Sequence, residues 1–480
     1  MDVIAKVPIR FYNTEKREKQ IFSPLYDNVV KLYTCGPTIY DFAHIGNFRT
    51  YIFEDLLRRT LKFFGYQVVQ VMNLTDVDDK TIRGATEKKV SLATFVQPFK
   101  NSFFVDLQSL NIERAEYYPA ATDYIAQMID FIQKLIDKNF AYKSKDNSIY
   151  YSIEKCPSYG RLSHLHLRDL KVGASDCRVT SDEYDKESIG DFVLWKAYDP
   201  KRDGDIFWDS PFGPGRPGWH LECSTMAMAL LGEMIDIHVG AVDNIFPHHE
   251  NEIAQSEAYS GKPFVKYWMH AEHLLVNHKK MSKSLGNFYT LRDLLGRGYH
   301  GPEIRYLLMQ GHYRTQLNFT FEALEGAKSS LLRINDFIRR LQEMADAERD
   351  NDSKRDSALL KNTFSSFCEA MADDLNVSVA IATVFDLMHE VNTLIDKKCF
   401  TPGDARGALL LLQKLDRVFG VMQFERKEEV PEEVRELLEK RQEARGRKEW
   451  KEADFFRDEI AKRGYVIEDT PKGARLKLHH

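Results

Sequence analysis

The segment VVKLYTCGP, residues 29–37, has the composition of a buried strand that a glycine and a proline close. Apolar residues then recur at helical spacing from His44 to Phe64, and Gly65 supplies a stop signal. The run VVQVM, residues 68–72, is a second strand-like segment. Strand, helix and strand in this order predict a parallel unit with a helix crossing one face of the sheet.

A second set of the same kind lies further along the chain. It runs from strand-like residues 235–239, through a helix over 250–260, to a predicted strand at 273–276. Two such sets favour an α/β fold with a doubly wound parallel (Rossmann-type) sheet, which binds ligands at the carboxyl ends of its strands. Residues 124–139 predict a helix, and the short strands and polar breakers around them indicate an insertion into this domain. From residue 321 onward amphipathic helices predominate, which predicts an all-α bundle.

These patterns divide the chain into six segments. We expect the sheet domain in two halves, residues 1–116 and 201–270, separated by a small connective insertion over 117–200. A linking region with a lysine-rich loop follows over 271–320, then a helical bundle over 321–425 and a small C-terminal module over 426–480.

Composition excludes several classes of protein. The 480 residues include 67 Lys and Arg against 72 Asp and Glu, and the net charge of −5 argues against a protein that coats nucleic acid non-specifically. The N-terminus lacks the pattern of a secretory signal, and no apolar run approaches the roughly 18 residues of a membrane span. Six scattered cysteines do not make a disulfide framework. We therefore expect a cytoplasmic protein without a membrane partner.

Two short motifs, one in each half, indicate phosphate chemistry. HIGN, residues 44–47, opens a helix, and the unpaired amides and dipole of a helix N-terminus suit a phosphate. KMSKS, residues 280–284, is a cationic loop able to neutralise charge on a transferring phosphate. Alone, each is more typical of a capped surface helix or a solvated basic loop. Their pairing in this order around a doubly wound sheet favours the functional interpretation.

The two motifs resemble the HIGH and KMSKS signatures of class I aminoacyl-tRNA synthetases. Within that class the sequence resembles the cysteinyl-tRNA synthetase family from near residue 8 to near residue 477, through YTCGPTIYD (33–41), NLTDVDDK (73–80), GRPGWHLEC (215–223) and FPHHENEIAQS (246–256). The resemblance implies a ligase that activates cysteine with Mg-ATP to cysteinyl-adenylate and pyrophosphate. It then implies transfer of the cysteinyl group to the terminal ribose of the cysteine tRNA.

The resemblance also implies roles for individual residues. For catalysis by positioning and charge stabilisation it implies His44, Asn47, Lys280 and Lys283. For ATP binding it implies the same four together with Thr38, Gly46 and Asp243. For cysteine binding it implies Cys35, Gly36, Thr75, Trp219 and His238. The chain departs from the family pattern at Asn47, where the signature has histidine, and at Ala241, where a second glycine is frequent.

A metal site is suggested first by spacing. His248 and Glu252 are four residues apart and share one face of a helix, whereas Cys35 ends the first strand and Cys223 precedes the helix of the second half. Two thiolates, an imidazole and a carboxylate are a donor set that suits zinc. Spacing alone leaves His249 and Glu250 as competing donors, which a helical arrangement would point away from the face of residue 252.

The resemblance implies that one Zn²⁺ per chain is bound by Cys35, Cys223, His248 and Glu252. Shape alone separates cysteine from serine by only about 1–3 kcal/mol. Zinc binds thiolate far better than hydroxyl, so we expect the substrate thiol to be a further ligand and an editing site to be unnecessary. The remaining cysteines are interpreted as small buried or partly buried residues, namely Cys156, Cys177, Cys368 and Cys399.

The RNA partner is implied by the C-terminal third. The resemblance makes residues 321–425, with DDLN at 373–376, an anticodon-binding bundle. In residues 426–480, basic side chains surround Trp450 and Phe455, which can stack on unpaired bases, although a solvated helix face explains the same pattern. We expect a monomer. Two alternatives are a related ligase that joins cysteine to a small amino-sugar and a non-catalytic zinc- and RNA-binding protein on the same fold.

Overall fold

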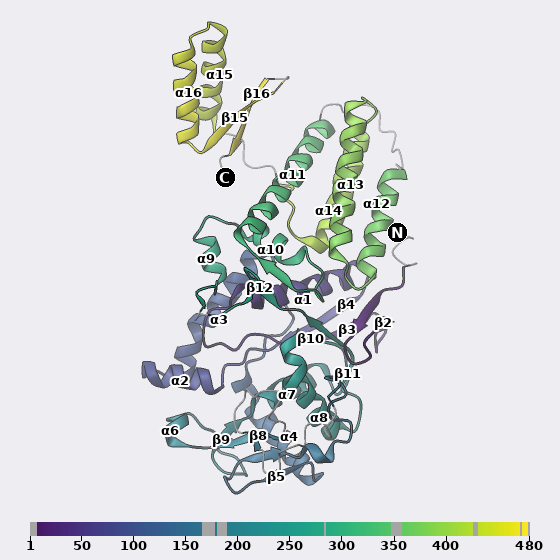
Figure 1. Ribbon diagram of the computed structural model, residues 1–480, viewed down its shortest axis with the longest axis vertical. Helices are drawn as coiled ribbons and strands as arrows, with labels where there is room; N and C mark the ends of the chain where they lie inside the picture. The colour runs from purple at the N-terminus through teal and green to yellow at the C-terminus, as the bar shows by residue number, and fades with distance from the viewer. Residues whose placement is uncertain are drawn as a thin grey trace. The chain divides into compact units, whose positions relative to one another are not determined.

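The computed structural model describes residues 7–165, 178–179, 190–282, 285–346, 358–425, 431–470 and 473–478. The chain forms two compact units, Met1–Met422 and Gln423–His480 (Figure 1). The larger unit contains a parallel sheet, an antiparallel insertion and a helical bundle.

Four parallel strands form the central sheet of the larger unit, which confirms the doubly wound arrangement. The order is β11-β10-β3-β4, with bounds Val265–Ala271, Ile235–Ala241, Val29–Thr34 and Gln67–Met72. Helix α1 (Ile45–Phe63) connects β3 to β4, and α8 (Glu250–Ser260) connects β10 to β11. The segments that follow the strands therefore lie along one edge of the sheet, where Cys35 follows β3 and Asn73 follows β4.

The predicted strand at 273–276 is wrong as a member of this sheet. The partner of β10 is β11, and residues Leu274–Val276 form β12 in a separate three-stranded sheet with β13 (Lys279–Lys280) and β14 (Leu317–Phe319). Lys266 and His270 interrupt the apolar run of β11, and this concealed a strand that is otherwise buried.

The insertion is a small sheet backed by α4 (Ile125–Asp137), antiparallel except where β7 pairs with β8 in parallel. Its path is β5-β6-β8-β7, with β9 paired to β8, and the bounds are Ala141–Lys143, Ile149–Tyr151, Asp191–Ala197, Arg178–Val179 and Gly215–Pro217. Because β9 lies beyond residue 200, this sheet runs directly into α7 (Trp219–Leu231). The apolar sides of the insertion, α7 and α8 share one core, so the insertion supports the helices that carry the predicted metal ligands.

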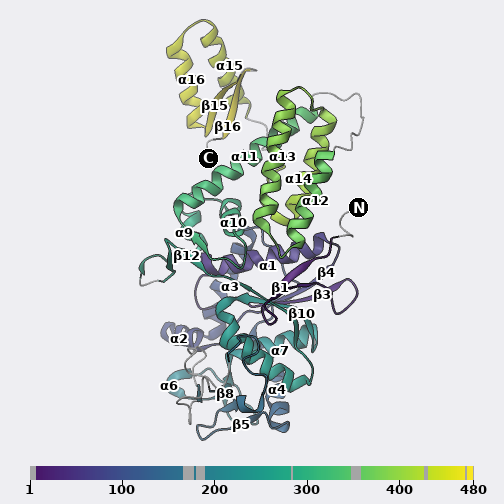
Figure 2. The ribbon, with the colours of Figure 1, turned by 45° about the vertical axis from the view of Figure 1, so that its right-hand side comes forward.

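Two further helices lie between the halves, α2 (Asp79–Lys88) and α3 (Leu92–Ser109), and a β1–β2 hairpin (Arg10–Asn13, Glu18–Ile21) precedes the sheet. After β13 the chain forms α9 (Leu291–Leu295) and α10 (Gly301–Met309). The bundle consists of α11, α12, α13 and α14, with bounds Phe321–Asp346, Ala358–Ala372, Val377–Asp396 and Pro402–Phe419 (Figure 2). Each buries an apolar stripe at helical spacing.

Among the described helices, α13 alone has the length and hydropathy of a membrane span. Asp386 and Glu390 interrupt its apolar residues, so it is not the unbroken apolar run whose absence the sequence indicates. The core helix of a bundle passes the same test, and α13 buries its apolar stripe from Val377 to Val391 within the bundle.

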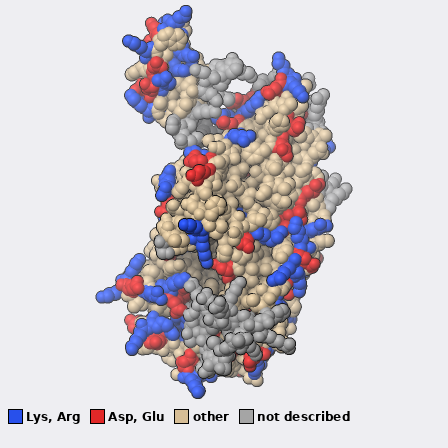
Figure 3. All heavy atoms as spheres, in the orientation of Figure 1, with Lys and Arg blue, Asp and Glu red and all other residues tan. Residues whose placement is uncertain are grey.

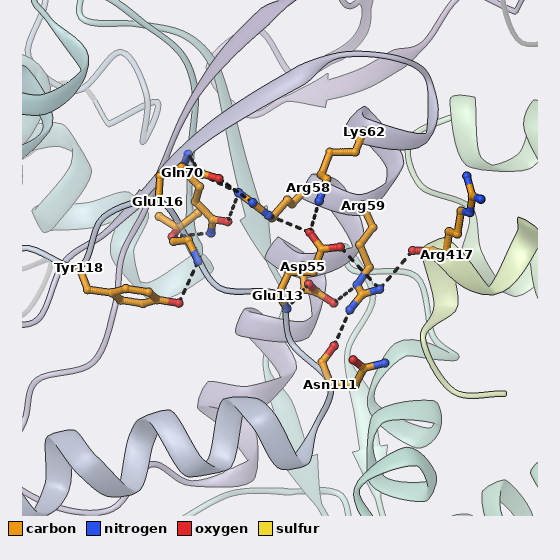
Figure 4. Close-up of polar contacts among 12 residues, drawn as sticks. Asp55, Arg58, Arg59, Lys62, Gln70, Asn111, Glu113, Glu116, Tyr118 and Arg417 are labelled. Atoms are coloured by element: carbon orange, nitrogen blue, oxygen red, sulfur yellow. Dashed lines mark hydrogen bonds and ion pairs between the residues drawn. The ribbon is translucent and has the colours of Figure 1, made fainter. Parts of the chain in front are cut away.

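Helix α1 is attached to the bundle through its C-terminal half. Arg59 donates to Asp55, to the carbonyl of Asn111 and to the carbonyl of Arg417 at the end of α14 (Figure 4). Arg58 and Lys62 bind acidic residues of the loop that follows α3, Glu113 and Glu116. The helix that starts with HIGN is therefore held at its far end by a network of charges.

The smaller unit contains α15 (Glu432–Gly446), α16 (Trp450–Lys462) and the antiparallel pair β15 (Tyr465–Thr470) and β16 (Gly473–Leu478). Trp450 and Phe455, the two predicted stacking residues, are 59% and 58% exposed. Lys and Arg side chains are intermixed with Asp and Glu over α15 and α16 on the face shown in Figure 3.

Candidate active site and metal centre

The HIGN motif forms the N-terminus of α1. His44 is the N-cap, and its Nδ1 accepts from the Asn47 amide at 3.1 Å, while Asn47 Oδ1 accepts from the His44 amide at 3.1 Å. This reciprocal pair is a capping box. A neutral His44 ring that accepts at Nδ1 carries its proton on Nε2, and Asn47 keeps its side-chain NH₂ as a donor. Asparagine therefore supplies at this position both the cap and a hydrogen-bond donor.

The KMSKS segment lies directly beside this cap. The Ile45 amide donates to the Tyr289 carbonyl at 3.0 Å, and the His44 ring packs edge-on against Phe288. A Cβ on Gly46 would lie 3.1 Å from the Met281 methyl, so the glycine allows the two motifs to approach closely. The two signature motifs, more than two hundred positions apart in sequence, therefore form one surface.

Asn287 braces the lysine loop and was not singled out by the sequence. Its Oδ1 accepts from the Ser282 amide at 2.8 Å and its Nδ2 donates to the Lys280 carbonyl at 3.2 Å. Lys280 is exposed on β13, next to the cap. Lys283, the other predicted catalytic lysine, lies outside the described residues.

The turn after β3 is tied to the turn after β4. The Gly36 amide donates to Asn73 Oδ1 at 2.9 Å, and Asn73 Nδ2 donates to Thr75 Oγ1 at 3.1 Å. Thr38 and Thr75 form an isolated parallel bridge, and Thr75 is 1% exposed. Gly36, Thr38 and Thr75 thus lie together, held by Asn73, a residue within the NLTDVDDK segment that sequence reasoning did not assign.

The four predicted metal ligands converge. The ligand atoms of Cys35, Cys223, His248 and Glu252 lie within 4.8 Å of one another. His248 Nε2 is 3.0 Å from Glu252 Oε1. Cys223 precedes α8, but it lies inside α7, a helix that the sequence patterns did not predict, and it is 1% exposed.

Burial and close contacts within this cluster shift the pKa values of three of its members. A hydrogen bond with Cys223, together with burial, raises the pKa of Cys35 well above that of an ordinary thiol. Burial opposes ionisation of Cys223, but its hydrogen bonds to Cys35 and His248 lower its pKa to about 6. Burial also disfavours the His248 imidazolium, yet Glu252 and Cys223 raise its pKa to about 10. The cluster therefore contains protons that a bound cation would displace.

The helical argument against His249 is wrong. Its Nε2 lies 3.3 Å from Cys35 Sγ, and Cys35, His238, His249 and Glu252 form a second, overlapping set of possible ligands. Residues Ile245–His249 form a π-type turn in which Phe246 has φ −137° and ψ 131°, so α-helical spacing does not apply there. Glu250 does point away, because it accepts from the backbone of residues 160–163.

Aromatic rings line the same centre. Trp219 stacks on His248 with centroids 4.2 Å apart, and His238, fully buried, stacks on Trp268 and lies 3.1 Å from Glu252 through Nε2. Two of the predicted cysteine-binding residues, Trp219 and His238, therefore contact predicted metal ligands.

Asp243 lies apart from the buried cluster. It is exposed in the short turn Val242–Asn244 that follows β10. Gly240 precedes that turn with no room for a side chain, because a Cβ would meet His249 at 2.7 Å. Ala241 is half-buried, and its amide donates to Asn244 Oδ1.

The donors fit a zinc ion by their chemistry. Two sulfurs, one imidazole nitrogen and one carboxylate oxygen from separate elements meet at a largely buried point, and such groups rarely converge without a cation to compensate their charge. The other cysteines lie elsewhere: Cys368 is buried, Cys156 is half-buried and Cys399 is exposed, contrary to expectation. Cys177 lies outside the described residues.

Comparison with known proteins accounts for these features. Residues 21–329 match the family of tRNA synthetases class I (C) catalytic domain, residues 366–423 the DALR domain and residues 427–475 the cysteinyl-tRNA ligase anticodon binding domain. The cysteine–tRNA ligase of Protochlamydia amoebophila (strain UWE25) is 58% identical over 99% of this chain and 98% of its own. The chain belongs to the cysteinyl-tRNA synthetase family. Its activity is that of an ATP-dependent cysteine–tRNA ligase.

Other similar proteins agree with this membership. The cysteine–tRNA ligase of Chlamydia felis (strain Fe/C-56) is 58% identical over 97% of both chains. Methionyl-tRNA synthetase of Mycobacterium tuberculosis, solved with methionyl-adenylate, superposes with a TM-score of 0.60 at 14% identity, covering 81% of this chain and 89% of that one. A LeuRS of Agrobacterium radiobacter K84 gives 0.60 at 12% identity, over 83% and 85%. These distant likenesses show the class I fold that this cysteinyl-tRNA synthetase shares. The full-length matches favour the cysteine–tRNA ligase over both alternatives, the ligase for a small amino-sugar and the non-catalytic zinc- and RNA-binding protein.

Proposed function

We propose that this enzyme selects cysteine with one zinc ion held by Cys35, Cys223, His248 and Glu252. The observation that carries the proposal is the convergence of these four donors at the edge of the parallel sheet. When bound there, zinc would supply a Lewis acid that prefers the thiolate of cysteine to the hydroxyl of serine. The protein's part is to hold the four donors together and to keep the site largely enclosed.

The amino acid is proposed to bind between the turns after β3 and β4 and the start of α7. Gly36 and Thr75 form one wall, cross-linked by Asn73, while Trp219 and His238 border the ligands from the other side. Placing the thiol at the metal brings the carboxylate of cysteine toward the signature motifs, because all these segments lie at the carboxyl ends of the strands.

Activation is proposed to occur at the joined signature motifs. The cysteine carboxylate attacks the α-phosphate of Mg-ATP, giving cysteinyl-adenylate and pyrophosphate. His44 Nε2 and the Asn47 NH₂ donate hydrogen bonds to phosphate at the N-terminus of α1, and Lys280 and Lys283 neutralise charge on the leaving pyrophosphate. Thr38 and Gly46 border the nucleotide, and Asp243 binds its ribose. No side chain acts as a covalent nucleophile.

The remaining assignments concern partners. The cysteine tRNA is proposed to bind through the bundle and through residues 426–480, where exposed Trp450 and Phe455 offer stacking surfaces. The cysteinyl group then passes to its terminal ribose. We further propose a monomer that works in the cytoplasm, which a sedimentation measurement and cell fractionation would test.

The decisive experiment is ATP–pyrophosphate exchange with cysteine and with serine, run beside measurement of bound metal. We expect one zinc per chain, exchange with cysteine only and loss of exchange in Cys223→Ser together with its zinc. X-ray absorption at the zinc edge should gain one sulfur neighbour when cysteine is added. An unchanged coordination shell would refute direct zinc–thiolate selection, and exchange that survives in zinc-free enzyme would refute the metal's role.

A further inference from the structure

One carboxylate outside the proposed site joins the catalytic half to the insertion. Asp79, the first residue of α2, accepts through Oδ2 from Lys196 Nζ at 2.9 Å and through Oδ1 from Arg216 Nη2. Lys196 and Arg216 are register partners on the antiparallel strands β8 and β9, so both side chains project from the same side of the insertion sheet. They are 2% and 1% exposed.

Arg216 is held from a second side as well. Its Nε donates to Asp203 Oδ1 at 3.2 Å, and Asp203 is fully buried. A buried guanidinium carries a large desolvation penalty unless carboxylates surround it. Arg216 between Asp79 and Asp203 satisfies that condition, so its position, and with it that of β9, is fixed by this network.

The chain leads from Arg216 straight into the proposed cysteine pocket. Trp219 follows three residues later and begins α7. Between them, the Gly218 amide donates to the Leu194 carbonyl at 2.9 Å, and a Cβ on Gly218 would lie 2.1 Å from the Val193 carbonyl. The chain is therefore pressed against β8, and a shift of β9 is transmitted to Trp219 without a flexible joint.

Asp79 is connected to the opposite wall of the pocket, at Thr75, by an equally short and fixed segment of chain. It follows Thr75 by four residues, and the intervening Asp76 is fixed by the backbone amide and hydroxyl of Thr122 at 3.0 and 2.6 Å. Asp78 then caps α2 through the Thr81 amide. The segment between the Thr75 wall and Asp79 is thus rigid.

We propose that the Asp79–Arg216 ion pair sets the separation of the Thr75 and Trp219 walls and so determines the enzyme's affinity for cysteine. The inference rests on the proposed function, which assigns those walls to the amino-acid pocket. Both members are positioning residues, because they act through Thr75 and Trp219. The signature motifs have their own supports, the His44–Asn47 cap and the Asn287 brace, so ATP binding is independent of the pair.

The test is the KM of full-length enzyme for cysteine and for ATP in pyrophosphate exchange. Asp79→Asn should raise the KM for cysteine about 10- to 100-fold, the scale of a small misplacement in a reacting site, and leave the KM for ATP within about twofold. Arg216→Lys keeps the positive charge but loses the paired donors of the guanidinium. It should raise the KM for cysteine by a smaller factor and leave the KM for ATP unchanged. The double variant should be no worse than Asp79→Asn, since the two residues act as one unit.

Arg202→Ala is the matched control. Arg202 binds Asp203 from the solvent side and its side chain is 38% exposed, so both KM values should stay unchanged. Bound zinc and Tm, measured on every variant, identify general misfolding, and Arg216→Lys carries the test if Asp79→Asn is too unstable for kinetics.

Equal changes in the KM for cysteine and for ATP, or additive effects in the double variant, would overturn the proposal. Its failure is separable from that of the proposed function. If Trp219→Ala leaves the KM for cysteine unchanged, the pocket assignment itself is wrong; if Trp219→Ala raises it and Asp79→Asn does not, only the positioning role is wrong.

Discussion

At Gly36 the structure leaves no room for a side chain. An added Cβ would lie 1.9 Å from the Asn73 carbonyl oxygen, so Gly36→Ala must push apart the ends of β3 and β4 beside Cys35. We expect it to cost about 1–3 kcal/mol of stability, as overpacking does, and to lower bound zinc. Tm and metal analysis would show this. Gly326→Ala on α11, where a Cβ meets nothing within 4 Å, is the control and should be neutral or stabilising. Equal Tm values for the two variants would contradict the steric argument.

Asp106 provides a prediction of pH dependence. Burial, which outweighs its ion pair with Arg292, raises the pKa of Asp106 from 3.8 to about 6. Between these values the native state binds more protons than the unfolded state, so the carboxyl reduces stability as pH rises, with the full penalty above pH 6. Asp106→Asn removes the titration, and its Tm relative to wild type should rise between pH 4 and pH 7. The shift corresponds to at most about 3 kcal/mol. A Tm difference that does not vary with pH would contradict it.

Site residues could be predicted from the sequence where the local backbone is regular and carries a recognisable motif or spacing. The signature residues and the i, i+4 pair His248–Glu252 follow from motif and helical spacing, and the structure places them in contact or at one helix end. His249 was rejected by the same spacing rule because that rule assumes an α-helix, and the π-type turn rotates its ring toward Cys35. Asn73 and Asn287 act by hydrogen bonds across the chain, which no periodicity reveals.

Among the elements, periodicity located those with unbroken apolar patterns. Helix α1 and strands β3, β4 and β10 were predicted near their observed bounds. Strand β11 was missed because its two polar residues are accommodated by tertiary contacts: His270 hydrogen-bonds to Thr14 and His249. A pattern rule cannot anticipate a buried polar side chain whose partners come from distant segments.

Helix α1 also provides a test of how elements are held together. Asp55, fully buried, accepts from Arg59 Nε at 2.7 Å and Arg305 Nη2 at 2.5 Å, and Arg305 donates to the Phe419 carbonyl. Burial opposes ionisation, but the two arginines lower the pKa of Asp55, so it stays charged. Asp55→Asn leaves buried cations uncompensated and should destabilise the enzyme by about 3–5 kcal/mol.

The matched control for Asp55→Asn is Asp336→Asn on α11. Asp336 pairs with Arg339 at the surface with 48% of its side chain exposed, so its loss should cost about 1 kcal/mol or less. Chemical unfolding followed by circular dichroism compares the two variants. If Asp55→Asn unfolds at the same denaturant concentration as Asp336→Asn, the buried network does not stabilise the junction of α1 with α10 and α14.

For the whole molecule, net charge is a poor guide to partners. The chain carries −5 overall, yet its family acts on tRNA, so the sign of the net charge does not reveal the partner. The start of the bundle follows from a change of apolar period, since a sheet and a bundle need different periods. The membership of β9 in the insertion sheet could not be predicted, because pairing between strands that are distant in sequence produces no local sequence pattern.

The two-unit organisation permits removal of the C-terminal unit. Asp416 accepts from the Val421 and Met422 amides, which closes the end of α14, so a chain ending at residue 425 keeps every described contact of that cap. Because the ligand cluster and signature motifs all lie within Met1–Met422, cysteine-dependent pyrophosphate exchange should stay within about twofold of wild type. Charging of the cysteine tRNA should fall about tenfold or more as stacking and phosphate contacts are lost. Trp450→Ala with Phe455→Ala in the full chain should reproduce part of that loss of tRNA charging. Equal loss of exchange and charging on truncation would show that the C-terminal unit supports the fold and does not bind the tRNA.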